Sequence, residues 1–329
     1  MGGAAGALLE VRDLHVSFDT EAGAVPAVRG VDLRVQRGET LAVVGESGCG
    51  KSVTALAILR LLDPSGRIER GAVRFDGQDL LGLSEPEMRA LRGRRIGMVF
   101  QEPMTSLNPV FTVGDQIGEV LAIHRGLGKR ERRAEAIRLL EKVGIPAAAE
   151  RVDQYPHEMS GGMKQRVMIA IAIACEPEVL IADEPTTALD VTVQAQILDL
   201  LRALQQEMRM AIVLITHNLG VVAQFAQRVL VMYAGKIVER SDVATLFREP
   251  LHPYTRALLR ALPSRSAHAE RLVSIAGTVP SPLEYPPGCA FCARCPDVLP
   301  RCADDEPRLE GVEAGHAVAC WLHAGTGAR

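Results

Sequence analysis

The sequence predicts an α/β domain followed by a smaller, cysteine-rich and irregular C-terminal extension. In the first part, short β-branched runs alternate with longer amphipathic stretches, the pattern of strands joined by helical crossovers. A glycine-rich phosphate-loop pattern follows the first buried run. The composition changes from Ser241 onward, because 10 of the 19 prolines and five of the seven cysteines lie in the last 89 residues. We therefore expect one domain over residues 1–240 and the extension over 241–329.

The predicted elements of the first domain are short buried strands and longer helices. Buried strands are predicted at 41–44, 96–100, 179–182, 211–215 and 229–233. Helices are predicted from Lys51 onward and over 191–208. Ala234 and Gly235 predict a hairpin turn from the fifth strand into 236–239. Beyond the composition boundary, only 243–248 and 254–262 have helical spacing.

Length and composition exclude several classes of protein. The chain has 329 residues, enough for one large domain or two smaller ones. Its 47% of hydrophobic residues excludes intrinsic disorder, and its net charge of −3 disfavours a dedicated polyanion binder. The apolar run over 167–175 has nine residues, fewer than the roughly 20 that cross a bilayer, so no membrane span is expected. Residues 1–9 lack the pattern of a signal peptide, which predicts reduced thiols.

The residues after the first predicted strand match the phosphate-loop pattern: Gly45, Glu46, Ser47, Gly48, Cys49, Gly50, Lys51 and Ser52. Glycines let the backbone turn so tightly that successive N–H groups face one anion, and the following helix adds its positive N-terminal end. Lys51 would reach the β- and γ-phosphates of a nucleotide, and Ser52 would ligate Mg²⁺. The pattern indicates nucleotide binding, but it does not by itself specify a function.

Polar residues follow three other predicted strands. Asp183 and Glu184 come after the third strand, at the carboxyl edge where open α/β sheets bind ligands. Asp183 would hold Mg²⁺ through its water shell, and Glu184 would polarise the water that attacks the γ-phosphate. Gln101 follows the second strand, where its amide would bind a metal-bound water, and His217 follows the fourth, where it would contact the γ-phosphate or the attacking water. Taken singly, each residue also fits a solvated or structural role.

A second helix start has the features of an anion site. Ser160 is a predicted N-cap, and Gly161 and Gly162 expose backbone N–H groups at the start of an apolar helix. This site lacks the lysine and the metal ligands that a nucleotide needs. A head-to-tail pairing of two chains would let each such site serve the nucleotide of the other chain.

Together these motifs resemble the nucleotide-binding subunits of ABC transporters. The motifs occur in the order of that family: the phosphate loop, Gln101, a signature over 159–165 (MSGGMKQ), Asp183-Glu184, Ala188-Leu189-Asp190 and His217. Phe18 lies where the family stacks an aromatic ring on adenine. The signature departs from the family by Met159 for leucine and Met163 for glutamine. The resemblance implies a mixed-sheet P-loop domain with a helical subdomain at about 102–175 that hydrolyses ATP with Mg²⁺.

Two segments look like the ATP-binding subunits of oligopeptide and dipeptide importers. They are 100–117 (FQEPMTSLNPVFTVGDQI) and 251–255 (LHPYT). The resemblance implies a peripheral subunit on the cytoplasmic face of the plasma membrane, which hydrolyses ATP to energise peptide import. It implies four partners: two membrane permease subunits, a second related ATPase and an extracytoplasmic substrate-binding protein. Nickel or another small solute is the alternative cargo, because the residues do not identify the solute.

Five cysteines crowd into the extension: Cys289, Cys292, Cys295, Cys302 and Cys320. In a reduced compartment this density indicates a metal, and sets of four thiolates bind either Zn²⁺ or an iron–sulfur cluster, with free thiols as the third possibility. The peptide-importer resemblance implies a [4Fe–4S] cluster whose ligands are Cys289, Cys295, Cys302 and Cys320, with Cys292 as the spare. Cys49 and Cys175 are expected to be packing residues.

Two other classes of function share some of these motifs. A soluble ABC-type ATPase acting on nucleic acid or the ribosome is expected to have a long coiled coil, a second ATPase unit or a basic surface, none of which the sequence contains. A regulatory module that binds ATP without hydrolysing it, and senses redox state through the extension, is disfavoured by Glu184 and His217.

Overall fold

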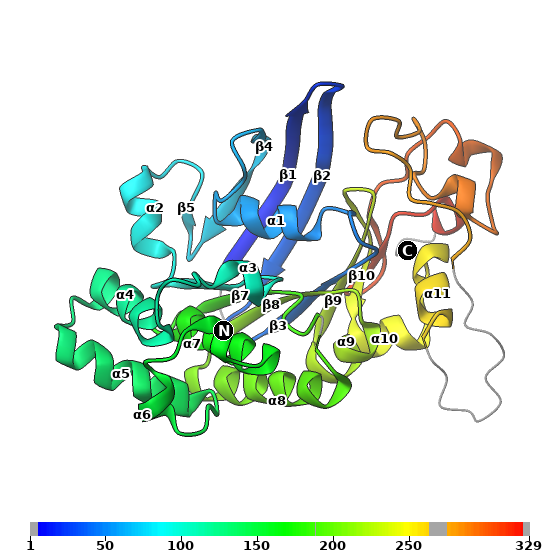
Figure 1. The fold of residues 1–329 in the computed structure, drawn as a ribbon. Helices are drawn as coiled ribbons and strands as arrows, with labels where there is room; N and C mark the ends of the chain where they lie inside the picture. The colour runs from blue at the N-terminus through cyan, green and yellow to red at the C-terminus, as the bar shows by residue number, and fades with distance from the viewer. Residues whose placement is uncertain (1–5, 188, 263–274, 325–329) are drawn as a thin grey trace, which may run out of the picture. The chain divides into compact units, whose positions relative to one another are not determined.

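The computed structural model describes residues 6–187, 189–262 and 275–324 (Figure 1). Ala188 of the predicted 188–190 motif lies outside these residues. The chain divides into two compact units. Unit 1 consists of Met1–Arg34, Thr40–Leu81 and Thr216–Arg329, and unit 2 of Val35–Glu39 and Gly82–Ile215.

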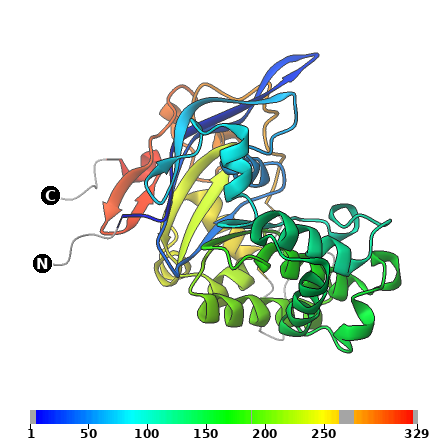
Figure 2. The ribbon, with the colours of Figure 1, turned by 90° about the vertical axis from the view of Figure 1, so that its left-hand side faces the viewer.

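The strands of unit 1 fall into two groups. An antiparallel group has the order β2-β1-β4-β5 and contains β1 (Leu9–Thr20), β2 (Gly23–Val35), β4 (Gly66–Phe75) and β5 (Gln78–Asp79). The other group has the order β11-β12-β10-β9-β3 and contains β3 (Thr40–Val44), β9 (Arg228–Tyr233), β10 (Lys236–Asp242), β11 (Glu310–Glu313) and β12 (His316–Val318). β3 is parallel to β9, whereas β10 is antiparallel to both β9 and β12. Figure 2 shows β11 and β12 in red at the edge of this group.

The extension packs into the apolar core of unit 1. Its helices are α10 (Val243–Arg248) and α11 (Pro253–Arg260), while α1 (Lys51–Ile58) and α9 (Leu219–Phe225) belong to the first part of the chain. The buried side chains of Tyr254 and Phe291 join one core cluster with Tyr233 of β9 and residues of β3. The three rings lie 4.6–5.4 Å apart between centroids. The extension and the strands beside it are therefore stabilised by burying the same apolar surface.

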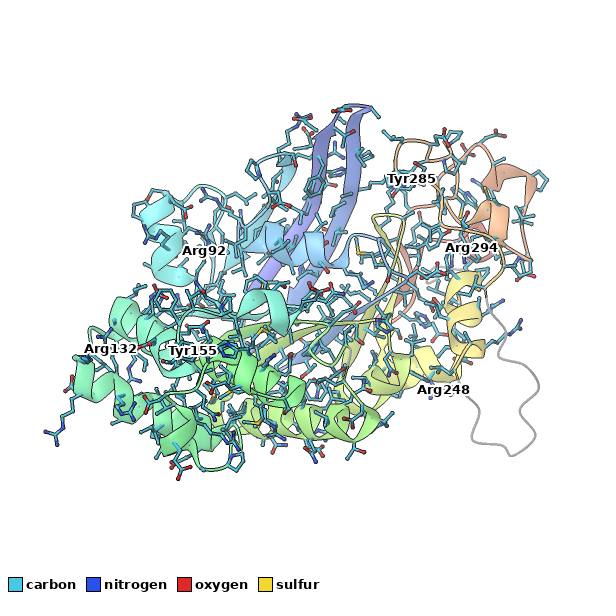
Figure 3. All side chains as sticks on the ribbon, in the orientation of Figure 1. Arg92, Arg132, Tyr155, Arg248, Tyr285 and Arg294 are labelled. Carbon is cyan, nitrogen blue, oxygen red and sulfur yellow. The ribbon has the colours of Figure 1, made fainter. Side chains whose placement is uncertain are left out.

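Polar contacts also attach the extension to the strands of unit 1. Arg29 of β2 donates to Glu306 at 2.9 Å, and Lys236 of β10 forms an ion pair with the same carboxylate. The guanidinium of Arg29 also lies 4.5 Å from the ring centroid of Tyr285, which Figure 3 labels. These contacts hold two separate segments of the extension against the strands.

Unit 2 contains three parallel strands and most of the helices. The strands have the order β8-β7-β6 and are β6 (Ile96–Val99), β7 (Val179–Asp183) and β8 (Ala211–Thr216). Its helices are α2 (Glu85–Leu91), α3 (Pro103–Ser106), α4 (Val113–Arg125), α5 (Lys129–Lys142), α6 (Ala148–Arg151), α7 (Gly161–Ile173) and α8 (Val191–Met208). All residues of β7 and β8 are buried, as expected for parallel strands covered on both faces.

An ion-pair group joins two helices of unit 2. Glu135 of α5 accepts hydrogen bonds from Arg138 on the same helix and from Arg125 at the end of α4. The hydrogen bond from Arg138 is the main reason that the pKa of Glu135 falls to about 2, with Arg125 adding to the effect against the opposing influence of burial.

The five predicted strands and the helix 191–208 are confirmed, with differences of at most one residue at the ends. The hairpin at Ala234 and Gly235 is confirmed by the antiparallel pairing of β9 and β10. The division at residue 240 and the helical subdomain at about 102–175 stay predictions. Among the described residues, no helix has both the length and the apolar character that crossing a membrane requires.

The prediction that the extension is irregular outside two helices is wrong in part. The structure adds the hairpin of β11 and β12 and three short 3₁₀ turns at Cys292–Arg294, Pro300–Cys302 and Trp321–His323. Strands of four and three residues, the first of them mostly exposed, are too short to show a period in the sequence. The second predicted helix begins at Pro253 rather than 254, because proline fits the first turn of a helix.

Candidate functional site

The phosphate loop of unit 1 forms the turn between β3 and α1. Gly50 is the N-cap of α1 and has φ of +102°, and a Cβ there would lie 2.5 Å from the carbonyl oxygen of Ala27. A Cβ on Gly45 would lie 2.2 Å from the carbonyl oxygen of Met232. Both positions therefore require glycine, because the loop is pressed against the backbones of β2 and β9.

Lys51 is the buried cation of this loop. Its side chain is almost fully buried, and Nζ donates to the carbonyl oxygens of Gly45 at 2.8 Å and Glu46 at 3.0 Å. The sulfur of Cys49 lies 3.8 Å from the same nitrogen, and Ser52 follows on the first turn of α1. A buried ammonium at a helix N-terminus fits a phosphate group, so this loop has the donor set that a nucleotide triphosphate needs. Ser52 supplies the hydroxyl expected for Mg²⁺.

In unit 2, the two predicted carboxylates lie at the end of β7. Asp183 and Glu184 are both buried, with 4% and 7% of their surface exposed. Glu184 has φ of +45°, a conformation that a side chain rarely adopts, and its N–H donates to the carbonyl of Ile215 on β8 at 2.9 Å. This hydrogen bond holds the chain in a left-handed turn directly after Asp183. Backbone strain of this kind is concentrated at functional sites.

The structure brings Gln101 and Glu184 together. The amide nitrogen of Gln101 donates to Oε2 of Glu184 at 3.4 Å. The hydroxyl of Thr187 donates to the same oxygen at 2.7 Å. Sequence reasoning missed Thr187, although its position three residues after a catalytic carboxylate candidate, in the turn Glu-Pro-Thr-Thr, was the available signal.

The signature motif forms the start of α7. Ser160 is the N-cap, as predicted, and its hydroxyl accepts from the backbone N–H of Met163 at 3.4 Å. Ser160 and Gly161 are exposed, and Gly162 is half-buried. Asp190 of the neighbouring motif caps α8 by accepting from Val193 at 2.9 Å. The start of α7 is therefore exposed, and the binding of an anion there stays a prediction.

The other predicted residues lie in unit 1. His217 is exposed and directly follows β8. Phe18 is half-buried on β1, opposite Gly66 of β4. The predicted residues therefore divide between the units: the phosphate loop, Phe18 and His217 are in unit 1, and Gln101, the signature and both carboxylates are in unit 2.

The cysteines of the extension line one small pocket in unit 1. Its wall includes Cys289, Cys292, Cys295, Cys302 and Cys320. Burial raises the pKa of the Cys289 thiol to about 12 and also raises the pKa of the Cys295 and Cys320 thiols. All seven cysteines are free thiols. Cys292 lines the pocket with the others, so its predicted role as the spare is not distinguished by position.

The donor set of this pocket, five thiols in its wall, fits a thiolate-bound metal group in chemistry. Among the described residues, no three histidine, cysteine, aspartate or glutamate side chains stand close enough together to hold a metal ion.

The two cysteines that were expected to be packing residues differ in burial: Cys49 is fully buried, whereas Cys175 is half-buried.

Comparisons with known proteins agree with these features. A family model described as "ABC transporter" matches residues 28–187, and one described as "Oligopeptide/dipeptide transporter, C-terminal region" matches 238–302. The chain is 51% identical to the dipeptide transport ATP-binding protein DppD of Bacillus subtilis, over 96% of this chain and 94% of the relative. It is 52% identical to DppD of Escherichia coli, over 95% of this chain and 96% of the relative.

A solved structure shows the same fold. The ATP-binding cassette MJ0796, in a dimeric post-hydrolysis state bound to ADP and Pi, is 28% identical with a TM-score of 0.65. The match covers 71% of this chain and 98% of the cassette. Since the curated relatives match over nearly the whole length, the chain belongs to the family of ABC transporter ATP-binding proteins that carry the oligopeptide/dipeptide transporter C-terminal region.

Proposed function

We propose that this chain hydrolyses ATP to energise the import of dipeptides or oligopeptides by an ABC transporter complex. The observation that carries the proposal is the pairing of a complete phosphate loop, with its buried Lys51, and a C-terminal region of the oligopeptide/dipeptide type in one chain. Family membership supports the ATPase activity. The names of the relatives, which specify dipeptide and oligopeptide transport, support the choice of peptide as cargo.

In this proposal each residue of the site has a separate task. Lys51 and the loop N–H groups bind the phosphates, and Ser52 and Asp183 hold Mg²⁺, which neutralises phosphate charge. Glu184 orients and polarises the attacking water, while Thr187 and Gln101 fix the position of its carboxylate. His217 contacts the γ-phosphate, and Phe18 stacks on adenine. Ser160, Gly161 and Gly162 contact the nucleotide bound by a second ATPase chain.

The complex needs partners that this chain does not supply. We infer two membrane permease subunits, a second related ATPase and an extracytoplasmic substrate-binding protein, with this chain on the cytoplasmic face of the plasma membrane. Import of nickel or another small solute is the alternative, since the binding protein and the permeases select the cargo.

The experiment is reconstitution of this chain with its membrane partners and binding protein in proteoliposomes, followed by uptake of a labelled dipeptide. We expect uptake that requires ATP and an ATPase rate that rises when the peptide-loaded binding protein is added. ATP turnover that responds to nickel or another solute, but not to peptides, would replace peptide as the cargo. Absence of ATP turnover in the complete assembly would overturn the whole proposal.

We also propose that the thiol pocket holds a [4Fe–4S] cluster whose ligands are Cys289, Cys295, Cys302 and Cys320. The gathering of five thiols around one pocket supports this assignment, although their positions are not those of a formed metal site. Such a cluster would supply a covalent cross-link among the loops of the extension, without taking part in ATP hydrolysis. Four iron and four sulfide per chain after anaerobic purification is the expected result, whereas one zinc, or no metal, would contradict it.

A further inference from the structure

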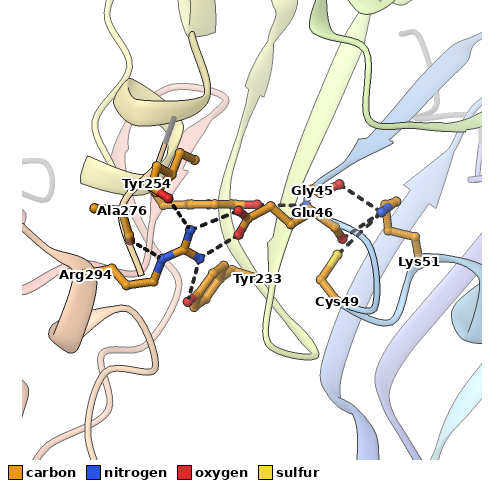
Figure 4. Close-up of polar contacts among 9 residues, drawn as sticks. Gly45, Glu46, Cys49, Lys51, Tyr233, Tyr254, Ala276 and Arg294 are labelled. Atoms are coloured by element: carbon orange, nitrogen blue, oxygen red, sulfur yellow. Dashed lines mark hydrogen bonds and ion pairs between the residues drawn. The ribbon is translucent and has the colours of Figure 1, made fainter. Parts of the chain in front are cut away.

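Arg294 connects the extension to the phosphate loop (Figure 4). Its guanidinium makes a two-pronged ion pair with Glu46, at 2.7 Å to Oε2 and 3.0 Å to Oε1. The side chain of Arg294 is only 4% exposed, and that of Glu46 is 27% exposed. Paired hydrogen bonds of this kind fix direction as well as distance, so the position of the Glu46 side chain depends on Arg294.

The remaining donors of Arg294 are fixed by its surroundings. Nε donates to the carbonyl oxygen of Ala276 at 2.9 Å, and Nη2 donates to that of Ile275 at 3.3 Å. Nη1 also donates to the hydroxyl of Tyr233 at 3.2 Å. The extension and β9 therefore fix the position of the guanidinium independently of its contact with the loop. Glu46 is the partner that adapts to it.

A second contact holds the backbone of the same loop residue. The N–H of Glu46 donates to the hydroxyl of Tyr254 at 2.8 Å. Tyr254 is fully buried on α11, where its ring packs against Tyr233 and Phe291. In a phosphate loop the backbone N–H groups bind the anion, yet this N–H faces the extension instead. Both the side chain and the backbone of Glu46 thus connect the phosphate loop to the extension.

Glu46 lies next to the groups of the loop that are proposed to bind phosphate. Lys51 donates to the carbonyl oxygen of Glu46, and the N–H of Cys49 donates to the same oxygen at 3.3 Å. A shift of Glu46 would therefore move a carbonyl oxygen that accepts from Lys51. It would also move the peptide between Cys49 and Gly50, whose neighbouring N–H donates to the same oxygen.

We propose that Arg294 is a positioning residue for the phosphate loop: through Glu46, and together with Tyr254, it makes the affinity for MgATP depend on the fold of the extension. The inference rests on the proposed ATP-binding function. Arg294 lies in the short turn between Cys292 and Cys295, so a rearrangement of the thiol pocket would move its backbone. The extension then acts on the nucleotide site by mechanical attachment, without contacting the nucleotide.

The test compares four variants of the full chain in the assembled complex: Arg294→Gln, Arg294→Lys, Glu46→Gln and the double variant Arg294→Gln/Glu46→Gln. Arg256→Gln is the matched control. Arg256 also donates to a carbonyl oxygen, that of Pro250, and forms an ion pair with the carboxylate of Asp297, and both of these partners lie in the extension. The readouts are KM for ATP, kcat, the affinity for a fluorescent ATP analogue and the thermal midpoint.

We expect Arg294→Gln and Glu46→Gln each to raise KM and weaken analogue binding about tenfold, within the usual range of coupling between sites. Because both act through one contact, the double variant should be no weaker than either single one. Arg294→Lys should give a smaller loss in affinity for ATP, because lysine keeps the positive charge but cannot form the two-pronged pair. Arg256→Gln should bind as the wild type does.

Three results would overturn the inference: additive losses in the double variant, unchanged KM in Arg294→Gln, or an equal loss in Arg256→Gln. A thermal midpoint that falls without a change in KM would likewise give Arg294 a structural role only. These outcomes differ from failure of the proposed function, in which the wild-type complex itself neither binds nor hydrolyses ATP. If Arg294→Gln does not fold, the inference is decided by Glu46→Gln and Arg294→Lys, which must both raise KM.

Discussion

The buried carboxylate of Glu239 is predicted to hold the extension in place. Glu239, on β10, is fully buried. Its two oxygens accept from the backbone N–H groups of Leu251 at 2.7 Å and His252 at 2.9 Å, and from His316 of β12 at 2.8 Å. The carboxylate thus joins β10, the start of α11 and β12. Replacing it by leucine leaves all three groups without this acceptor.

The size of the effect follows from those three groups. A buried donor that loses its acceptor costs about 1–3 kcal/mol. Three such losses, reduced by local relaxation and entry of water, predict that Glu239→Leu destabilises the extension by about 3–6 kcal/mol. Glu239→Gln keeps one acceptor oxygen, so its cost should be about half as large. Glu310→Leu is the control, because Glu310 is exposed on β11.

The assay uses a natural reporter. Trp321 is the only tryptophan of the sequence, and its indole N–H donates to the carbonyl of Asp305 within the extension. Urea unfolding followed by its fluorescence therefore measures the stability of the extension. Surface substitutions usually change stability by no more than about 0.5 kcal/mol. The reasoning is refuted if Glu239→Leu lowers the stability of the extension by less than about 1 kcal/mol, or by no more than Glu310→Leu does.

Three further substitutions test the loop, the signature helix and the helical ion pair. Gly45→Ala should weaken ATP binding by more than about 100-fold, because the added Cβ would lie 2.2 Å from a backbone carbonyl oxygen. The control is Gly311→Ala, which should bind ATP as the wild type does, because a Cβ there would meet open space. Equilibrium titration with a fluorescent ATP analogue distinguishes the two variants. Ser160→Ala removes the cap of α7 and should cost about 1 kcal/mol, seen as faster hydrogen exchange in its first turn, and unchanged exchange would contradict the cap. The pKa of Glu135 lies at about 2 in the folded chain against 4.5 for the free side chain, so its ion pairs stabilise the fold above about pH 4.5 and lose this effect as the pH falls toward 2. Glu135→Gln should therefore lower the thermal midpoint at pH 7, with the difference from wild type shrinking below pH 4.5; a difference that is constant with pH would rule out this ion-pair effect.

Sequence reasoning was most successful where one residue type has one structural use. The phosphate loop requires glycine at Gly45 and Gly50 because backbone carbonyls lie within 2.5 Å of where a Cβ would be, and the motif records that requirement directly. The buried strands of unit 2 are continuous apolar runs, so their positions were predicted to within one residue. The cap at Ser160 was likewise visible from its place before two glycines.

The contacts between distant segments could not be predicted in this way. Arg294 and Glu46 are separated by 248 positions, and no sequence pattern connects the two side chains. Pairing across such a separation depends on the fold of the extension, which local sequence patterns do not specify. Thr187 was missed for a different reason: it lies three residues after Glu184 in the same turn, but the sequence does not specify which hydroxyl reaches the carboxylate, as that of Thr187 does at 2.7 Å.

The central claim is that the chain binds MgATP and hydrolyses it with Glu184 as the residue that polarises water. The most direct measurement is phosphate release by the assembled transporter carrying Glu184→Gln, together with the amount of ATP that remains bound after rapid filtration. The account predicts retained, intact ATP and a rate lowered by about 10²–10⁴-fold, the usual contribution of a general base. Hydrolysis at the wild-type rate, or loss of bound ATP without cleavage, would contradict it.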